Sequence, residues 1–167
     1  TASVFTQAEC DLVHDAARPF VPLDLIDRLL IAIEDGAAAA VPGLPPVETV
    51  KRVGEGGRVV ETPHRDRLRM IGTPQALKRP IAHEAFVRHA KGDAVFTDCA
   101  SVLEAYGADV RVVAGDARTF KVTMPEDLVR AETLLGCPSR RHPCRDRIRL
   151  APLRGGPPAR PPRRPHT

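Results

Sequence analysis

The chain has 167 residues, which suits a single domain, and 43% of them are hydrophobic, which is enough to build a core. The net charge of +4 is uneven: residues 136–167 hold nine Arg and one Asp, or +8, so residues 1–135 carry −4. No apolar run is long enough to cross a membrane, and we expect a cytoplasmic protein without a secretory leader. The four Cys are then expected to be reduced thiols, and their spacing does not match a zinc site.

The first motif, LVHDAARPFV, covers residues 12–21 and joins an apolar pair to His14, Asp15 and Arg18. We interpret the apolar pair as the end of a buried strand. Ligands of open α/β sheets bind beyond the carboxyl ends of strands, so these polar residues are site candidates. Taken alone, Asp15 and Arg18 could instead form a surface ion pair with a cap, and His14 could be a hydrogen-bonded core imidazole.

An amphipathic helix is predicted next, over residues 23–35. Leu25 and Leu29 fall on one apolar stripe, and Gly36 follows as a stop signal. The run AAAAVPG, residues 37–43, then predicts a short buried strand.

A hairpin is predicted from residues 47–53 and 58–62, which flank the turn sequence GEGG. This glycine-rich turn is not a phosphate-binding loop, because it does not lie between a strand and a helix. Three alternating arginines after the hairpin could form one charged strand face. They are Arg65, Arg67 and Arg69.

Residues 75–91 are predicted to be helical, with a break at Pro80. A second helix is expected from Asp98, as its N-cap, to Gly107. A role in capping the helix would be enough to explain Thr97 and Asp98. A helix N-terminus also offers backbone donors to a phosphate, however.

Two further strands are predicted, over residues 109–115 and 120–123. Thr123 and Glu126 match a capping box, and the helix that follows ends at Gly136. Strands that alternate with helices predict an α/β fold with a largely parallel sheet, from which the hairpin projects.

The C-terminal segment differs from the rest. Residues 136–167 contain eight Pro and nine Arg without apolar periodicity, so we predict a disordered tail after a domain of residues 1–135. Such a tail could bind nucleic acid through its charge, which leaves a nucleic-acid-binding protein as an alternative function. Its composition also resembles a GC-rich gene read out of frame.

Five motifs follow one another over residues 1–135. They are LVHDAARPFV, AAAAVPGLPPVETVKRV, VVETPHRDRLRMIGTPQA, FTDCASVLEAYG and FKVTMPEDLVRAETLL. With these motifs the chain resembles the C-terminal three-fifths of 2-C-methyl-D-erythritol 4-phosphate cytidylyltransferases, which implies a Rossmann-like nucleotidyltransferase sheet, here incomplete, with a β-hairpin arm.

The resemblance implies transfer of a cytidylyl group from CTP to 2-C-methyl-D-erythritol 4-phosphate, with release of pyrophosphate, in non-mevalonate isoprenoid biosynthesis. The acceptor oxygen attacks the α-phosphorus directly, so catalysis relies on positioning and charge stabilisation. Mg²⁺, held mainly through the CTP phosphates, is the implied cofactor. A related sugar-phosphate nucleotidyltransferase with another base or acceptor is the alternative enzyme.

The resemblance also implies the site residues. Lys121 and Arg65 would be catalytic, because they bind the acceptor phosphate and aim it at CTP. The implied substrate-binding residues are Asp15, Arg18, Thr49, Thr73 and Thr97. Ser3 matches a nucleotide-binding serine. Residues 45–68 would reach across a homodimer, so that Thr49 and Arg65 serve the partner's site.

The family's N-terminal glycine-rich loop, which cradles the CTP triphosphate, has no counterpart in this sequence. We therefore expect the chain alone to turn over CTP poorly. We expect no membrane partner and no nucleic-acid partner for the enzyme, and no second activity in the tail.

Overall fold

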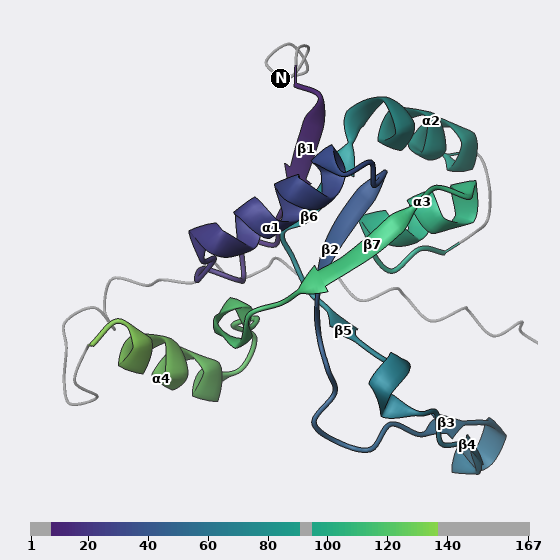
Figure 1. The fold of residues 1–167 in the computed structure, drawn as a ribbon. Helices are drawn as coiled ribbons and strands as arrows, with labels where there is room; N and C mark the ends of the chain where they lie inside the picture. The colour runs from purple at the N-terminus through teal and green to yellow at the C-terminus, as the bar shows by residue number, and fades with distance from the viewer. Residues whose placement is uncertain (1–7, 91–94, 137–167) are drawn as a thin grey trace, which may run out of the picture. The chain divides into compact units, whose positions relative to one another are not determined.

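The computed structural model describes residues 8–90 and 95–136. Within these residues it has a five-stranded sheet and a separate two-stranded sheet (Figure 1). The strands are β1 (Cys10–Val13), β2 (Ala39–Leu44), β3 (Arg52–Val53), β4 (Val59–Glu61), β5 (Met70–Ile71), β6 (Gln75–Lys78) and β7 (Val110–Ala114). The α-helices are α1 (Leu23–Glu34), α2 (Arg79–His89), α3 (Cys99–Tyr106) and α4 (Pro125–Leu134).

The chain divides into two compact units, residues 1–127 and residues 128–167. The first contains both sheets and helices α1 to α3. The described part of the second is the remainder of α4 and its end at Gly136, which has a left-handed φ of 68°. The predicted disordered tail, apart from Gly136, lies outside the described residues.

The larger sheet has the order β1-β6-β2-β5, with β7 also paired to β2. The β2–β7 pair is parallel, but β1–β6, β2–β6 and β2–β5 are antiparallel. The prediction of a largely parallel sheet is therefore wrong. The chain passes through the arm after β2, and β6 enters the sheet at the end where β1 and β2 leave it.

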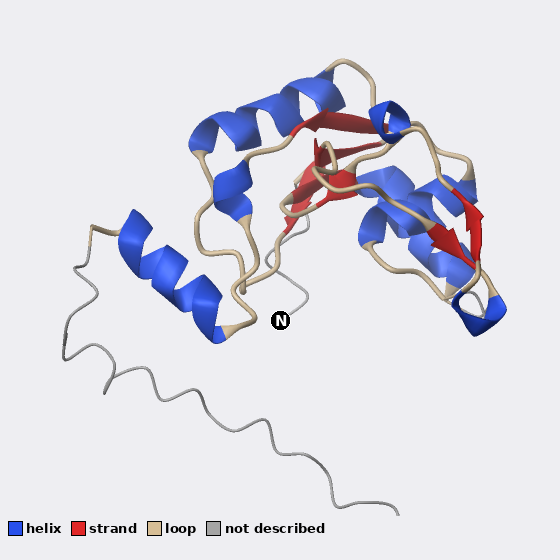
Figure 2. Ribbon diagram, turned by 90° about the horizontal axis from the view of Figure 1, so that it is seen from below, coloured by secondary structure: helices blue, strands red, loops and turns tan. Residues whose placement is uncertain are grey.

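Helices cover both faces of this sheet (Figure 2). Ala39 of β2 packs with Leu77, α2 and α3, whereas the next residue, Ala40, packs with Ala76 and α1. Successive side chains of a strand point to opposite faces, so these alanines face different helical layers. The buried run predicted over residues 37–43 is confirmed, and a strand buried on both faces has this continuous apolar pattern.

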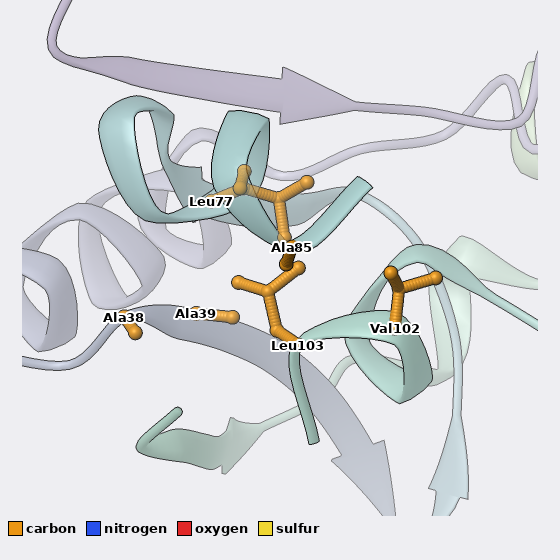
Figure 3. Packing of buried hydrophobic residues seen from close by; sticks show 7 residues of the cluster. Ala38, Ala39, Leu77, Ala85, Val102 and Leu103 are labelled. Atoms are coloured by element: carbon orange, nitrogen blue, oxygen red, sulfur yellow. The ribbon is translucent and has the colours of Figure 1, made fainter. Parts of the chain in front are cut away.

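The cluster on the α2–α3 face is shown in Figure 3, where Leu103 lies close to Ala39 and Ala85. Leu103 and Leu77 are both almost fully buried. The small alanines of β2 allow these leucines to pack close to the strand. This close packing fixes α3 and β6 against β2.

The helix predicted over residues 23–35 is confirmed as α1, with Leu25 and Leu29 fully buried. The helix predicted from Asp98 is confirmed as α3. Asp98 accepts from the Ser101 amide at 2.9 Å, and Gly107 ends the helix with a left-handed φ of 87°.

The prediction of a helix over residues 75–91 is wrong at its start, because Gln75–Lys78 form strand β6. Pro80 does not break a helix but lies in the first turn of α2, where its missing N–H costs no intrahelical hydrogen bond. A strand of four residues is too short to show a period of its own, so the helical signal that follows it dominated the prediction.

The predicted strand over residues 120–123 is not formed, since these residues are in loop conformation. The capping prediction is also corrected: Asp127, not Glu126, accepts from the Thr123 amide at 2.9 Å and from its hydroxyl at 3.2 Å. The same carboxylate accepts from the Met124 amide at 2.9 Å.

Strand β1 ends at Val13, as predicted, but this end is not buried. Leu12 is 43% and Val13 is 39% exposed. Within the described residues β1 pairs with β6 alone, so it is an edge strand with one open side.

The hairpin is confirmed as β3 and β4, which pair antiparallel through Arg52 and Glu61. We call residues 45–68, which contain this hairpin, the arm. Arg65–Arg67 form a short 3₁₀ turn, so the alternative that Arg65, Arg67 and Arg69 share one strand face is wrong. The arm's valines are exposed: Val47, Val50, Val53, Val59 and Val60.

Candidate active site

The polar residues after β1 meet the loop before β6. Val13 pairs with Gln75 in the antiparallel ladder, so the C-terminal end of β1 lies beside the N-terminal end of β6. The Asp15 amide donates to Thr73 Oγ1 at 3.0 Å. The register of one strand pair thus joins two motifs that are far apart in the sequence.

Asp15 is the centre of this arrangement. Its Oδ2 lies 2.7 Å from Lys121 Nζ, and its Oδ1 accepts from the Ala17 amide at 3.0 Å. The hydrogen bond from Lys121 holds the pKa of Asp15 below its ordinary value, with a further contribution from the Ala17 amide. Asp15 is therefore a carboxylate at neutral pH and fixes the ammonium group of Lys121.

Lys121 reaches Asp15 because its loop is anchored beside the first motif. The Val122 amide donates to Ala17 O at 2.8 Å, and the rings of Phe20 and Phe120 stack with centroids 5.8 Å apart. About half of the Lys121 side chain, 48%, is exposed. The ammonium group is held in place and remains accessible to a ligand.

The guanidinium group of Arg18 is bound by the loop before Lys121 and not by the Asp15 carboxylate. Its Nη1 donates to Thr119 O at 2.7 Å, and its buried Nε has no hydrogen-bond partner among the described residues. The ion pair of Asp15 is with Lys121, so the alternative of an Asp15–Arg18 surface pair is wrong. We call Asp15, Arg18, Thr73 and Lys121 the Asp15 cluster.

His14 is hydrogen-bonded through both ring nitrogens, although it is exposed rather than a core residue. Its Nε2 lies 2.8 Å from Arg18 O, and its Nδ1 lies 3.1 Å from Thr73 Oγ1. A carbonyl oxygen only accepts, so Nε2 carries the hydrogen, and a neutral ring then accepts the Thr73 hydroxyl at Nδ1. His14 braces the loop and is not positioned as a free base.

A buried amide adjoins the cluster, and the sequence did not single it out. Gln75 is 2% exposed and donates from Nε2 to Asp98 Oδ2 at 2.9 Å. Burial works to raise the pKa of Asp98, but the bonds from Gln75 and Ser101 outweigh it and lower this pKa. The only sequence signal was that Gln75 lies near the end of the motif VVETPHRDRLRMIGTPQA.

The remaining predicted residues are not brought into the cluster. Thr97 is exposed just before α3, and Thr49 is exposed on the arm. Arg65 lies on the 3₁₀ turn of the arm, where it lines a shallow pocket with Asp66 and Arg69. In the part of the chain that the structure describes, no hydrogen bond or ion pair links Thr49 or Arg65 to the cluster, and Ser3 is outside that part.

A sequence profile of the family 2-C-methyl-D-erythritol 4-phosphate cytidylyltransferase matches residues 2–137. The chain belongs to this family. The match covers the Asp15 cluster and the arm, and it confirms the resemblance found from the five motifs. Members of this family are transferases of the cytidylyltransferase type.

Curated relatives and solved structures agree with this assignment. The cytidylyltransferase of Frankia casuarinae is 47% identical over 124 residues, which are 74% of this chain and 46% of the relative. That of Streptomyces avermitilis is 48% identical over 133 residues, 74% of this chain and 51% of the relative. The crystal structure of the Thermus thermophilus enzyme superimposes with a TM-score of 0.68 at 37% identity, over 77% of this chain and 62% of that one.

These comparisons confirm the predicted fold, a Rossmann-like nucleotidyltransferase sheet that is incomplete here and carries a hairpin arm. The chain spans about half the length of the curated relatives it matches. Among the helices of residues 8–90 and 95–136, none is both long and apolar enough to cross a membrane.

Proposed function

We propose that this chain is the acceptor-binding part of a 2-C-methyl-D-erythritol 4-phosphate cytidylyltransferase. In the proposed reaction, a phosphate oxygen of the acceptor attacks the α-phosphorus of CTP, and the bond to the β-phosphate breaks. The products are 4-diphosphocytidyl-2-C-methyl-D-erythritol and pyrophosphate, and the pathway is non-mevalonate isoprenoid biosynthesis.

The observation that carries this proposal is the 2.7 Å pair between Asp15 and Lys121. A lone lysine on a loop would sample many rotamers, and a ligand would lose affinity by ordering it. Asp15 orders Lys121 in advance, and the ammonium group of this half-exposed side chain then offers its remaining N–H donors to a phosphate. Arg18 adds a second cation whose main-chain partner leaves part of the guanidinium for a ligand.

The charge of the cluster also suits a phosphate monoester. Lys121 and Arg18 together carry two positive charges against the one negative charge of Asp15, so the cluster has a net positive charge at neutral pH. In this proposal Lys121 binds the acceptor phosphate and aims its oxygen at CTP, while Asp15, Arg18 and Thr73 hold the rest of the acceptor.

Mg²⁺ is part of the proposal, and the donor groups in the cluster are compatible with it. Within the described residues there is no group of three or more His, Cys, Asp or Glu side chains that could hold a metal ion. Mg²⁺ is commonly bound through one or two carboxylates together with substrate phosphates and water. The cluster supplies one carboxylate, Asp15, and the other ligands of the ion would have to come from the substrate and water. We therefore propose that the ion would be held mainly by the CTP phosphates, whose charge it would neutralise.

A homodimer in the cytoplasm completes the proposal. The exposed valines of the arm and the marginal stability of a two-stranded hairpin in water favour packing of the arm on a partner. Arg65 and Thr49 would then complete the phosphate site of the second subunit. This agrees with the finding that, among the described residues, neither bonds to the cluster of its own chain.

Binding of the acceptor tests the proposal directly. Titration of the 167-residue chain with 2-C-methyl-D-erythritol 4-phosphate in a calorimeter should give saturable binding, and the unphosphorylated tetrol should bind much more weakly. Because the sequence has no counterpart of the glycine-rich loop, a coupled pyrophosphate assay should show little turnover. Equal affinity for the phosphorylated and unphosphorylated compounds would contradict the proposed substrate.

A further inference from the structure

Gln75 joins two loops that come from different parts of the chain. From Nε2 it donates to Gly72 O at 3.3 Å and to Asp98 Oδ2 at 2.9 Å. Its Oε1 accepts from the Ala100 amide at 3.2 Å. One side chain therefore connects the loop before β6 with the beginning of α3.

The orientation of this amide is determined by its partners. Gly72 O and the carboxylate of Asp98 only accept, so the NH₂ group of Gln75 must face both of them. The Ala100 amide only donates, so the carbonyl oxygen must face α3. The other orientation would place acceptor against acceptor in a buried site, where unsatisfied polar groups are costly.

The link from Gln75 to Asp98 is not needed to cap α3. Asp98 Oδ1 already accepts from the Ser101 amide at 2.9 Å, and Ser101 Oγ bonds back to Asp98 O at 2.8 Å. The second carboxylate oxygen is the one that binds Gln75. The capping of the helix and the connection between loops therefore use different atoms.

The residues beside the two anchors are both site candidates. Thr73 follows Gly72 and belongs to the Asp15 cluster, while Thr97 precedes Asp98. Gln75 bonds to Gly72 and to Asp98, which adjoin these threonines, but to neither threonine itself. A shift of either loop would break a buried hydrogen bond, so the amide sets the position of one threonine relative to the other.

We propose that Gln75 is a positioning residue for the acceptor site, holding the Thr73 loop and the Thr97 loop in register through Gly72, Asp98 and Ala100. This inference rests on the proposed function, because the two loops are taken to be held in register in order to bind the sugar-alcohol phosphate. Gln75 itself makes no contact with the acceptor.

The test compares three variants of the full chain with one control. Gln75→Met keeps the side-chain length and removes all three hydrogen bonds. Gln75→Glu places a carboxylate against that of Asp98. The exchange Gln75→Glu with Asp98→Asn restores only the bond between positions 75 and 98, because the new amide at position 98 donates to the new carboxylate at position 75 and still caps the helix. The bond to Gly72 O stays broken, since a carboxylate cannot donate to it. Leu29→Ala is the control, since this fully buried residue packs on the other face of the sheet.

The measurement is the Kd for 2-C-methyl-D-erythritol 4-phosphate by calorimetry, together with the urea midpoint. Gln75→Met should raise the Kd about tenfold, and Gln75→Glu should raise it further. The exchange should recover only part of the affinity lost in Gln75→Glu, because it re-makes the bond between positions 75 and 98 but not the bond to Gly72 O. Leu29→Ala should lower the urea midpoint and leave the Kd of the folded protein unchanged.

A double-mutant cycle separates positioning from a general loss of stability. Thr97→Val, alone and combined with Gln75→Met, should give non-additive losses of affinity, because Thr97→Val removes a proposed contact with the acceptor that Gln75→Met has already misplaced. If Gln75→Met does not fold, Gln75→Glu, which also breaks the bonds to Gly72 and Asp98, is combined with Thr97→Val instead.

The outcomes distinguish this inference from the proposed function. The positioning role would be overturned if the parent chain bound the acceptor tightly and Gln75→Met did not change the Kd. It would also be overturned if Gln75→Met and Thr97→Val gave strictly additive losses of affinity. Either result would leave the proposed function in place. Failure of the parent chain to bind the acceptor would contradict the proposed function, and the positioning role would fall with it.

Discussion

Side chains of the Asp15 cluster are held by other parts of the same chain, whereas those of the arm are left exposed. Lys121 is fixed by Asp15, and Asp15 in turn is fixed by amides and by Thr73. On the arm, Arg65 and the valines have no comparable contacts among the described residues. Under the proposed function, one half of the acceptor site would be preorganised within a subunit and the other half would depend on a partner.

The largest effect is expected from a variant that disrupts the Asp15 cluster, the preorganised half of the proposed acceptor site. Lys121→Met should raise the Kd for the acceptor about 100-fold, because it removes a charge-assisted bond to phosphate and leaves Asp15 as an unpaired anion in the site. Calorimetric titration measures this change. Lys78→Met is the matched control, since Lys78 is exposed at the end of β6 and outside the cluster. Equal losses in both variants would show that only overall charge matters.

The second prediction tests whether the two halves meet across subunits. Lys121→Met and Arg65→Leu should each bind the acceptor weakly, but a mixture should recover binding at about a quarter of its sites. In a two-fold dimer, half of the subunits pair as heterodimers, and each heterodimer has one site with both cations intact. The number of sites from calorimetry after refolding the mixture measures this recovery. No recovery would place Arg65 and Lys121 in the same subunit's site, or in no common site.

The third prediction concerns the pH dependence of the Asp15–Lys121 pair. The folded-state pKa of Asp15 is lower than its ordinary value of 3.8. The pair therefore contributes to stability in full above pH 3.8, and the contribution is lost as the pH falls through the lower folded value. Urea midpoints measured as the pH is lowered below 3.8 should fall more steeply for the parent than for Asp15→Asn.

Lys121→Met provides the control for this measurement. It removes the main cause of the lowered pKa while keeping the carboxyl group, so its pH dependence should be close to that of Asp15→Asn. A parent chain and an Asp15→Asn variant with parallel curves would contradict the pairing of Asp15 with Lys121.

The smallest expected effect is on the arm. Val60 is 65% exposed, so Val60→Ser should change the free energy of unfolding of a dilute sample by no more than about 0.5 kcal/mol. The same change should weaken self-association severalfold, because it removes apolar surface from the proposed interface. Urea titration and sedimentation equilibrium measure the two quantities. Unchanged association would exclude Val60 from the interface.

Elements with local signals could be predicted from the sequence. The apolar stripe of α1 and the N-cap and C-cap of α3 at Asp98 and Gly107 depend on residues a few positions apart. Strand β6 could not be predicted, because three buried residues followed by the exposed Lys78 have no period that separates them from the helix they precede. The direction of β6, and hence the antiparallel pairing in the sheet, also depends on where the arm returns the chain.

The contacts within the site show the same limit. From the residue types alone, Asp15 could be expected to pair with a nearby cation, and Arg18 is the cation closest to it in the sequence. The actual partner is Lys121, and this choice depends on the 2.8 Å bond between Val122 and Ala17, which only the folded chain contains. The resemblance to a family placed both residues in one site, although it did not imply their pairing.

The pairing of Val13 with Gln75 also has a consequence for the order in which the site assembles. The two segments are separated by α1, β2 and the arm, so closing this contact costs the chain entropy of a long loop. Thr73 cannot reach Asp15 until the β1–β6 ladder has formed. Amide hydrogen exchange at the open-edged β1 should therefore report the loss of the binding site before the core around Leu103 unfolds.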